Sequence, residues 1–261
     1  MSYLRLVLIF YKNSLLTELE YRANFLFNIV MSGFWLLWSI LSVSIFFQHR
    51  EQIGGWSYYE ALAVLGLFSL MNGIIAAVLR PNVDRLVESI RLGTFDFVLT
   101  KPVNSQFMAS VRHLVIWHLT DVVIGLGIIL YAVNRLGIPV TLERVFFFAT
   151  LVLAACIIVY SFWLGLVTLA FWFVRVDNIV EIFNAFYEAG RFPVDAFPRW
   201  AQGLLTFVVP IAFVTTVPAS AAVGRLQPFY GLYALALALI LFTGATLFWR
   251  FALRHYTSAS S

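Results

Sequence analysis

Five long apolar runs decide what this chain can fold into. They lie at about residues 23–47, 58–79, 106–133, 145–174 and 228–249. A helix that crosses the hydrocarbon core of a bilayer needs about 20 mostly apolar residues, and each run is long enough. Hydrophobic residues make up 62% of the 261 residues, well above the roughly 45–50% of soluble domains. The sequence therefore predicts an all-α, polytopic membrane protein with a single transmembrane domain, residues 1–261.

The residues before the first run predict a helix of a different kind. Apolar side chains recur there at helical spacing, with charged residues between them. The apolar positions are Leu4, Leu8, Tyr11, Leu15 and Leu19, and the charged ones are Arg5, Lys12 and Glu20. This pattern is typical of an amphipathic helix that lies in the membrane interface. We expect such a helix over residues 1–22; the alternative is an extension of the first span.

The distribution of Lys and Arg predicts which side of the membrane each loop occupies. With a cytoplasmic N-terminus, the outer loops between the first four spans hold only Arg50, Arg135 and Arg144. The cytoplasmic side then holds the segment 80–101 together with Arg5, Lys12, Arg22, Arg175, Arg250 and Arg254. Cytoplasmic loops are enriched in Lys and Arg, so this orientation is favoured. The same basic face explains the net charge of +4 without nucleic-acid binding.

Residues 175–227 are compatible with two topologies, both with six spans and cytoplasmic termini. In the first, 176–192 is a short fifth span, and 193–223 is an extracellular segment that dips into the membrane and returns. In the second, 176–199 stays cytoplasmic and 201–223 is the span. The second topology places Arg191 and Arg199 in the cytoplasm, where loops are enriched in Lys and Arg, and this favours it. However, Pro210 and Pro218 would interrupt its span. The residue pattern leaves both open.

The segment from Arg80 to Pro102 differs most from the rest of the chain. It carries seven charged residues, although only 11% of the whole chain is charged. Val83, Leu86, Val87 and Ile90 share one helix face, and charged residues occupy much of the other. Pro81 suits the first turn of a helix, Gly93 suits its C-terminal cap, and Asn104 or Ser105 can cap the next helix. The segment is either a docking helix for a soluble partner or an ordinary solvated helix.

Two further polar groups lie near or within the apolar runs. Asp177, Glu181, Asn184 and Glu188 fall on one helix face, which predicts either a stripe that lines a substrate path or faces another subunit, or a water-facing surface. Arg112, His113, His118 and Asp121 open the third run, and His118 can pair with Asp121 at i, i+3. We interpret these four as interfacial residues, because one His and one Asp fall short of a metal site.

Several motifs are absent from the sequence. It contains no G-x-x-x-x-G-K-[ST] phosphate-binding loop, no H-E-x-x-H and no G-x-S-x-G. The only cysteine is Cys156, so no disulfide framework is expected. We therefore expect no catalytic residue and no metal or cofactor in this chain.

Two segments together resemble type-2 ATP-binding-cassette (ABC-2) exporter permeases of bacteria. Residues 88–104 contain an I-R-x-G-x-x-D-x-x-L-x-x-P pattern, formed by Ile90, Arg91, Gly93, Asp96, Leu99 and Pro102. Residues 190–225 resemble the proline-punctuated segment before the last span of that family, through Pro193, Phe197, Pro198, Pro210, Pro218 and Ala219. The order of elements is similar over essentially the full length.

The resemblance implies a permease of the bacterial inner membrane that pairs with itself or a sister permease. A separate ABC ATPase would bind ATP and Mg²⁺ and dock on a cytoplasmic coupling region, residues 80–104. The residues implied in that contact are Arg85, Glu88, Arg91, Gly93, Asp96 and Lys101. Glu181, Asn184 and Glu188 would lie on a substrate path or a dimer face. The resemblance also favours the first topology.

The expected function is thus ATP-driven transport, most simply export of a hydrophobic or amphipathic substrate. The alternatives are a secondary transporter and a membrane scaffold without ATP coupling. A secondary transporter calls for ionisable residues in mid-span and often shows internal repeats. No clear repeat is present, and the spans before residue 175 hold few charges.

Overall fold

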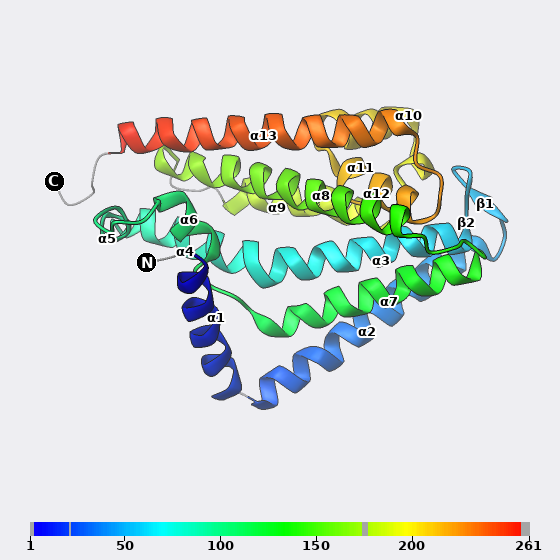
Figure 1. Cartoon of the computed structure of the whole chain (residues 1–261), viewed down its shortest axis with the longest axis horizontal. Helices are drawn as coiled ribbons and strands as arrows, with labels where there is room; N and C mark the ends of the chain where they lie inside the picture. Colours follow the sequence, from blue (N-terminus) through cyan, green and yellow to red (C-terminus); the bar gives the residue numbers. More distant parts are fainter. Residues whose placement is uncertain (1–2, 21, 174–176, 257–261) are drawn as a thin grey trace.

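The protein is a bundle of long helices that run roughly side by side (Figure 1). The computed structural model describes residues 3–20, 22–173 and 177–256. Within them, five helical stretches are long and apolar enough to cross a membrane: Leu26–Phe47, Tyr58–Arg91, Ile116–Arg135, Leu142–Phe171 and Pro228–His255. A sixth is added if one bent helix pair counts as a span. The prediction of an all-α polytopic membrane protein is therefore confirmed.

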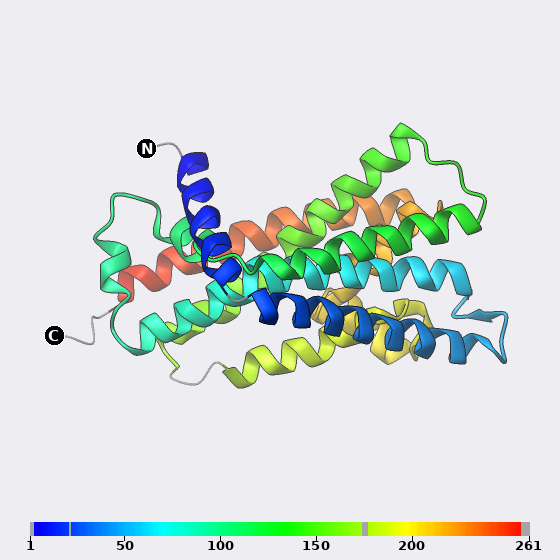
Figure 2. The same cartoon turned by 90° about the horizontal axis from the view of Figure 1, so that it is seen from below.

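The long helices are α1 (Tyr3–Glu20), α2 (Arg22–Phe47), α3 (Tyr58–Ile74), α7 (Leu119–Arg135), α8 (Leu142–Thr168) and α13 (Pro228–His255). Shorter helices connect them: α4 (Arg80–Arg91), α5 (Asp96–Leu99), α6 (Ser105–Val111), α9 (Asp177–Glu188), α10 (Arg199–Gly203), α11 (Ile211–Val214) and α12 (Thr216–Ala222). The strands β1 (Gln52–Ile53) and β2 (Trp56–Ser57) form one antiparallel turn. We call the end of the bundle that holds this turn the β-turn end, and the opposite end the α4 end (Figure 2).

Helix α3 lies at the centre of the bundle. In its most apolar stretch 78% of the residues are buried, against 6% in α2. Its partner α7 approaches closely because glycines face each other. A Cβ at Gly125 would lie 2.5 Å from the Gly66 carbonyl oxygen, and one at Gly73 would lie 2.8 Å from the Val122 nitrogen. Such small-residue contacts bring helix backbones together in membranes, where lipid tails are as apolar as the side chains.

We expect Gly125→Val to separate α3 from α7 and to lower the free energy of unfolding by about 3 kcal/mol or more, because the new side chain meets backbone atoms. Gly127→Val is the matched control, since a Cβ there has no neighbour within 4 Å. Denaturation of the detergent-solubilised protein, followed by circular dichroism, measures both. Equal losses in the two variants would contradict the role given to Gly125.

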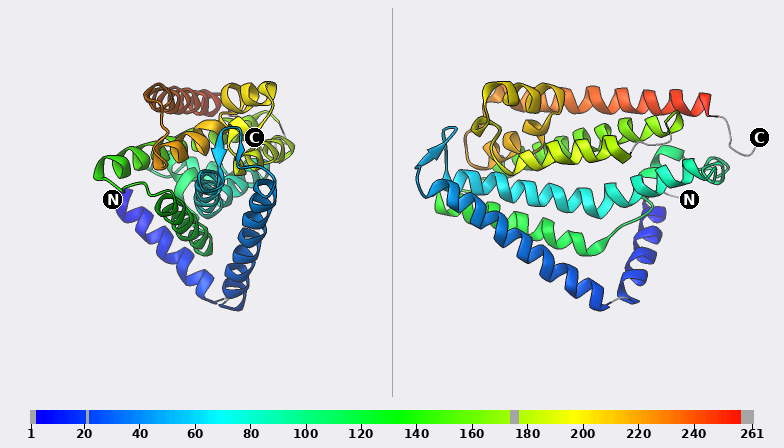
Figure 3. Two further views of the ribbon diagram at one scale, coloured as in Figure 1. Left: turned by 90° about the vertical axis from the view of Figure 1, so that its right-hand side faces the viewer. Right: turned by 180° about the vertical axis from the view of Figure 1, so that it is seen from behind.

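Helix α1 lies across the bundle axis at the α4 end rather than along it (Figure 3). Leu4, Leu8 and Leu16 are exposed on it. Its polar side chains reach the chain just before α7: the Glu18 carboxylate accepts from the Ile116 N–H at 2.9 Å, and the Ser14 hydroxyl accepts from the Leu114 N–H at 3.3 Å. Leu19 and Glu20, which belong to the same predicted pattern, have side chains outside the described set. The helix expected before the first span is present and separate from it.

The third apolar run differs from the expectation. The sequence predicted one span over 106–133, but α6 ends at Val111 and the spanning helix begins only at Ile116. The predicted cap of α6 is confirmed, because Asn104 Oδ1 accepts from the Phe107 N–H at 3.0 Å. The helix breaks because the backbone of residues 113–115 bonds to α1, to Ala77 beyond the end of α3 and to Asn82 of α4. Apolar composition alone does not reveal this competition.

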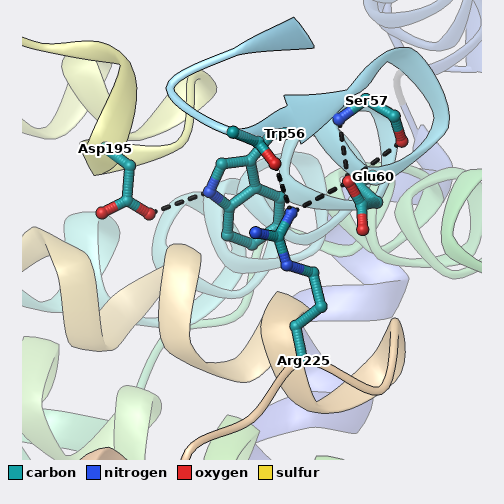
Figure 4. Close-up of polar contacts among 6 residues, drawn as sticks. Trp56, Ser57, Glu60, Asp195 and Arg225 are labelled. Atoms are coloured by element: carbon teal, nitrogen blue, oxygen red, sulfur yellow. Dashed lines mark hydrogen bonds and ion pairs between the residues drawn. The ribbon is translucent and has the colours of Figure 1, made fainter.

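Residues 193–225 begin and end at the β-turn end (Figure 4). The Asp195 carboxylate accepts from Trp56 Nε1 at 2.8 Å. Arg225 donates to the Gly55 carbonyl at 2.8 Å, pairs with Glu60 at 3.0 Å and covers the Trp56 ring at 4.8 Å. Between these contacts the helix pair Arg199–Val208 and Ile211–Ala222 bends by 69°. The segment therefore begins and ends at the same end of the described bundle, and residues 201–223 form a bent helix pair rather than one straight helix.

The turn between β1 and β2 allows this contact. Gly54 and Gly55 both have positive φ, as a two-residue hairpin turn of this kind requires. At Gly54 a Cβ would also lie 2.5 Å from the Asp195 carbonyl carbon. Any side chain at this position would therefore push Asp195 away from Trp56. The remaining connection, α9, begins near the α4 end and runs toward the β-turn end (Figure 2); Arg175 and Val176 lie outside the described residues.

Candidate functional site at the α4 end

One helix joins the β-turn end to the charged segment at the α4 end. It runs from Tyr58 to Arg91 over 34 residues, which is about 51 Å at 1.5 Å per residue. The hydrocarbon core of a bilayer is about 30 Å thick. The helix is therefore too long to lie wholly inside it when it stands upright. The charged part, α4, is the continuation of a span rather than a separate loop helix.

The helix changes its winding where the span meets α4. Residues Ile75–Leu79 form a π-helical turn directly before Pro81. Proline has no N–H, so it leaves the carbonyl four residues earlier without its usual partner. That carbonyl belongs to Ala77, and it accepts instead from the Val115 N–H at 2.9 Å. The proline and the π turn thus open the helix to a neighbouring segment at the base of α7.

Asn82 fixes the same junction from the next position. Its side-chain amide donates to the His113 carbonyl at 2.7 Å, and its Oδ1 accepts from the His113 N–H at 2.9 Å. The residue is only 3% exposed. It also donates to the carbonyl of Val78 within its own helix. One side chain therefore holds α4 and the chain before α7 in a fixed relation.

Asn82 was not among the site residues predicted from the sequence. Asn82, Leu86 and Ile90 are spaced by four and are the buried residues of α4. A polar residue in register with two buried apolar ones signals a buried hydrogen bond, and that signal was present in the sequence.

We expect Asn82→Leu to free residues 113–115 from α4. The His113 N–H and carbonyl would lose their partners, at about 1–3 kcal/mol for each buried polar group left unpaired. Hydrogen exchange of the His113 and Val115 amides should then accelerate strongly. Asn134→Leu, at an exposed position at the β-turn end, should leave both amides protected. Protection that persists in Asn82→Leu would show that the clamp is not needed.

The apolar face of α4 anchors the segment to its own bundle. Leu86 and Ile90 are buried, as predicted. Gly93, with φ +70°, reverses the chain after α4 so that Phe95 returns to the bundle and is fully buried. The Phe95 ring lies 6.0 Å from that of Trp249 and 5.7 Å from that of Phe171. The apolar core here consists of Leu86, Ile90, Phe95, Leu164, Val167, Ala245 and Trp249.

The opposite face of α4 presents charge to the outside. Arg85, Glu88 and Arg91 are exposed on it, and Lys101 is exposed after α5. The contact set expected from the sequence is thus mostly on one surface. Gly93 is different, because it is half-buried and shapes the turn.

Two groups beside this surface interact with the chain's own residues. The half-buried Asp96 lies near Tyr256, and burial together with the Asp96 charge raises the pKa of the Tyr256 hydroxyl. Burial, with the positive charges of Arg85 and Arg112, lowers the pKa of His113 to about 4. The His113 side chain is therefore neutral near pH 7.

The polar stripe on α9 lies apart from the α4 surface. Glu181 and Glu188 are exposed and Asn184 is half-buried, whereas Phe183 and Tyr187 on the other face are buried. Glu188 pairs with Arg191. The side chain of Asp177, the fourth residue of the predicted stripe, lies outside the described set. The stripe therefore faces away from the core of this chain.

The polar residues before and within α7 separate into two places. His113 lies at the α4 junction, whereas His118 Nδ1 lies 3.3 Å from Asp121 Oδ2, which confirms the predicted pair. Among residues 3–20, 22–173 and 177–256, no group of three or more His, Cys, Asp or Glu side chains is placed to hold a metal ion.

These features define a multi-pass α-helical membrane protein in which a span continues into a structured, charged surface. Comparison with protein families assigns it further: the family described as ABC-2 family transporter protein matches residues 34–260. The chain belongs to this family, whose membrane proteins are permease components of ABC transporters, so the resemblance seen in the sequence is confirmed. Neither the curated proteins nor the solved structures contain a match to the chain.

Proposed function

We propose that this chain is the membrane-spanning permease of an ATP-driven exporter, powered by a separate ATPase that docks on the α4 surface. The observation that carries the proposal is the unbroken helix from Tyr58 to Arg91. Its first part is the central, most buried span, and its last part presents Arg85, Glu88 and Arg91 to the outside. A force applied to the charged face would reach the bundle core through one continuous helix, whose π turn is held by the bond between Val115 and Ala77.

The anchoring of α4 supports this role. Asn82 binds it to the base of α7, and Phe95 binds the following turn to α8 and α13. A docked subunit that moves α4 would therefore move the ends of α7, α8 and α13 as well. Rigid-body displacement of this kind is a common way to transmit a conformational change. ATP and Mg²⁺ would be held by the ATPase, because this chain has no phosphate-binding loop.

We assign the ATPase contact to Arg85, Glu88, Arg91 and Lys101, with Gly93 and Asp96 shaping the surface. The double variant Arg85→Glu/Arg91→Glu should reduce the ATPase that co-purifies with the tagged chain from native membranes by about tenfold or more. Reversing two charges at a contact replaces attraction with repulsion, and each 1.4 kcal/mol is a factor of ten. The readout is ATPase activity per mole of purified permease.

Arg50→Glu/Arg135→Glu is the matched control, with the same charge change at the β-turn end. It should retain the ATPase. If both double variants retain it, α4 is not the docking surface. If the unaltered chain purifies without any ATPase activity, ATP coupling itself is in doubt, and a secondary transporter or a scaffold becomes the better reading.

A second permease copy or a sister permease would complete the transporter. The support is the outward-facing Glu181 and Glu188 on α9, whose side chains are exposed. Carboxylates are costly against lipid tails. We therefore assign the stripe Glu181, Asn184 and Glu188 to a dimer face or substrate path, and the remaining apolar surface to lipid.

We place the protein in a bacterial inner membrane with both termini and the coupling region, residues 80–104, in the cytoplasm. The β-turn end is then extracellular, residues 193–223 form a re-entrant segment, and α9 is a short fifth span. The support is that Asp195 and Arg225 share contacts with one turn. Helix α1 lies in the cytoplasmic interface, which accounts for its exposed leucines.

Cysteine labelling tests this placement. In a Cys156→Ala background, Arg199→Cys should react with a membrane-impermeant maleimide in intact cells. Both Arg199 and Thr100 are exposed in the structure, so Thr100→Cys is the matched position at the α4 end and should react only after permeabilisation. The reverse pattern would invert the topology. Labelling of both in intact cells would contradict a membrane between the two ends.

A further inference from the structure

A polar pocket lies between α2, α3 and the start of α7. It has a volume of about 260 Å³. Its lining includes the polar residues Ser32, Ser39, Ser69, Asn72, His118, Asp121 and Arg191, and the aromatic residues Trp35, Phe68 and Trp117. Most of these residues belong to helices long enough to span a membrane. Polar side chains at this position are surrounded by an apolar region.

Arg191 is the charged group that most needs an explanation. It pairs with the exposed Glu188, and its guanidinium lies 5.2 Å from the centre of the Phe68 ring. Its Nε is buried and has no hydrogen-bond partner among the described residues. A buried donor without a partner costs about 1–3 kcal/mol. An ionisable side chain at the depth of the spans marks a functional site by default.

The opposite charge in the pocket belongs to Asp121. One of its oxygens faces His118 Nδ1 at 3.3 Å. The lining therefore offers one guanidinium and one carboxylate, together with the Asn72 amide and the Ser32 hydroxyl, which bond to no other side chain in the described part of the protein. A purely anionic ligand would meet Asp121, and a purely cationic one would meet Arg191.

The pocket is open toward the membrane. Trp35 is 59% exposed, and the α2 residues around it are largely free of contact with the bundle. Sites for whole drug-sized ligands measure roughly 300–1,000 Å³. At 260 Å³, this pocket suits a head group, while an attached chain could lie beside α2 and remain in lipid.

We propose that this pocket binds the zwitterionic head of an amphiphile, with its phosphate or carboxylate on Arg191 and its ammonium on Asp121. The acyl chain leaves between α2 and α7 into the bilayer. Binding of the amphiphile to this pocket does not depend on the proposed function. The additional inference that the amphiphile is the transported substrate rests on the proposed function.

Tryptophan quenching tests the binding, because Trp35 and Trp117 line the pocket. The full chain in an uncharged detergent is titrated with a brominated single-chain phosphoethanolamine amphiphile. We expect saturable quenching, with affinity about tenfold or more above that of a brominated alkyl glucoside or alkylamine. The glucoside loses both charge-assisted contacts, and the alkylamine loses the one to Arg191. Equal affinity for all three probes would overturn the proposal, and so would an absence of saturable quenching, the result expected of a pocket that holds only water or is covered by a second copy of the chain.

Two charge variants assign the contacts. Arg191→Gln should weaken phosphoethanolamine binding about tenfold, whereas Arg199→Gln, an arginine at the β-turn end, should not change it. Asp121→Asn should weaken phosphoethanolamine but strengthen a brominated fatty acid, because the repelling carboxylate is gone. If Arg191→Gln does not fold, the opposite responses of the two probes to Asp121→Asn still decide the outcome. Identical responses would refute the assignment.

The outcome for the proposed function is read separately. ATPase that co-purifies with the unaltered chain reports on the proposed function, and amphiphile binding by the purified chain reports on the pocket. Binding without any ATPase would leave the pocket intact as a site and remove its role in ATP-driven transport. ATPase without binding would remove the amphiphile site alone.

Discussion

The close contact between α3 and α7 is the constraint on which the rest of the structure depends. In a bilayer, apolar side chains gain little by leaving lipid for another helix, so association relies on tight packing and on polar contacts. Gly66, Gly73 and Gly125 allow the two backbones to meet. Because α3 is thereby fixed at the centre, the remaining helices can leave one side to lipid, as α2 does along most of its length.

Polar contacts then act at the two ends of this central helix. At the β-turn end, Glu60 and Trp56 bind both ends of the segment 195–225. At the α4 end, Asn82 binds the base of α7, and Phe95 inserts between α8 and α13. The same element therefore touches almost every other part of the bundle. A permease that must transmit movement across a membrane benefits from such a connection. The proposed coupling role therefore includes the buried residues Asn82 and Phe95 as well as the charged face of α4.

Much of this could be predicted from residue patterns. The lengths of the apolar runs predicted the positions of four spanning helices closely. The spacing of Leu86 and Ile90 identified the buried face of α4. Gly93 was correctly assigned to the turn after it, and Asn104 to a helix cap. These features depend on local chemistry, where each residue's own preference decides the outcome.

The misses have a different cause. The predicted start of the third span was wrong because the backbone groups of His113 and Val115 bond to residues more than 30 positions earlier. Phe95 lies against Trp249, and Arg191 lies against Phe68, each on another helix. The spacing of Asn82 with Leu86 and Ile90 was visible in the sequence, but its partner His113, which lies 31 positions later, was not. The return of the segment 195–225 to the β-turn end likewise depends on a contact between residues 139 positions apart, Asp195 and Trp56. Long-range partners of this kind leave little trace in periodicity or in the count of Lys and Arg residues.

The π turn at Ile75–Leu79 has a consequence for how such a chain can vary. An α-helix rotates by about 100° for each residue, so one residue more or fewer between Gly73 and Asn82 would swing everything beyond it around the helix axis. Leu86 and Ile90 would leave the apolar core that they share with Phe95, and Arg85 and Glu88 would leave their exposed positions. The number of residues in this single π turn therefore fixes the rotation of α4 about the helix axis relative to α3.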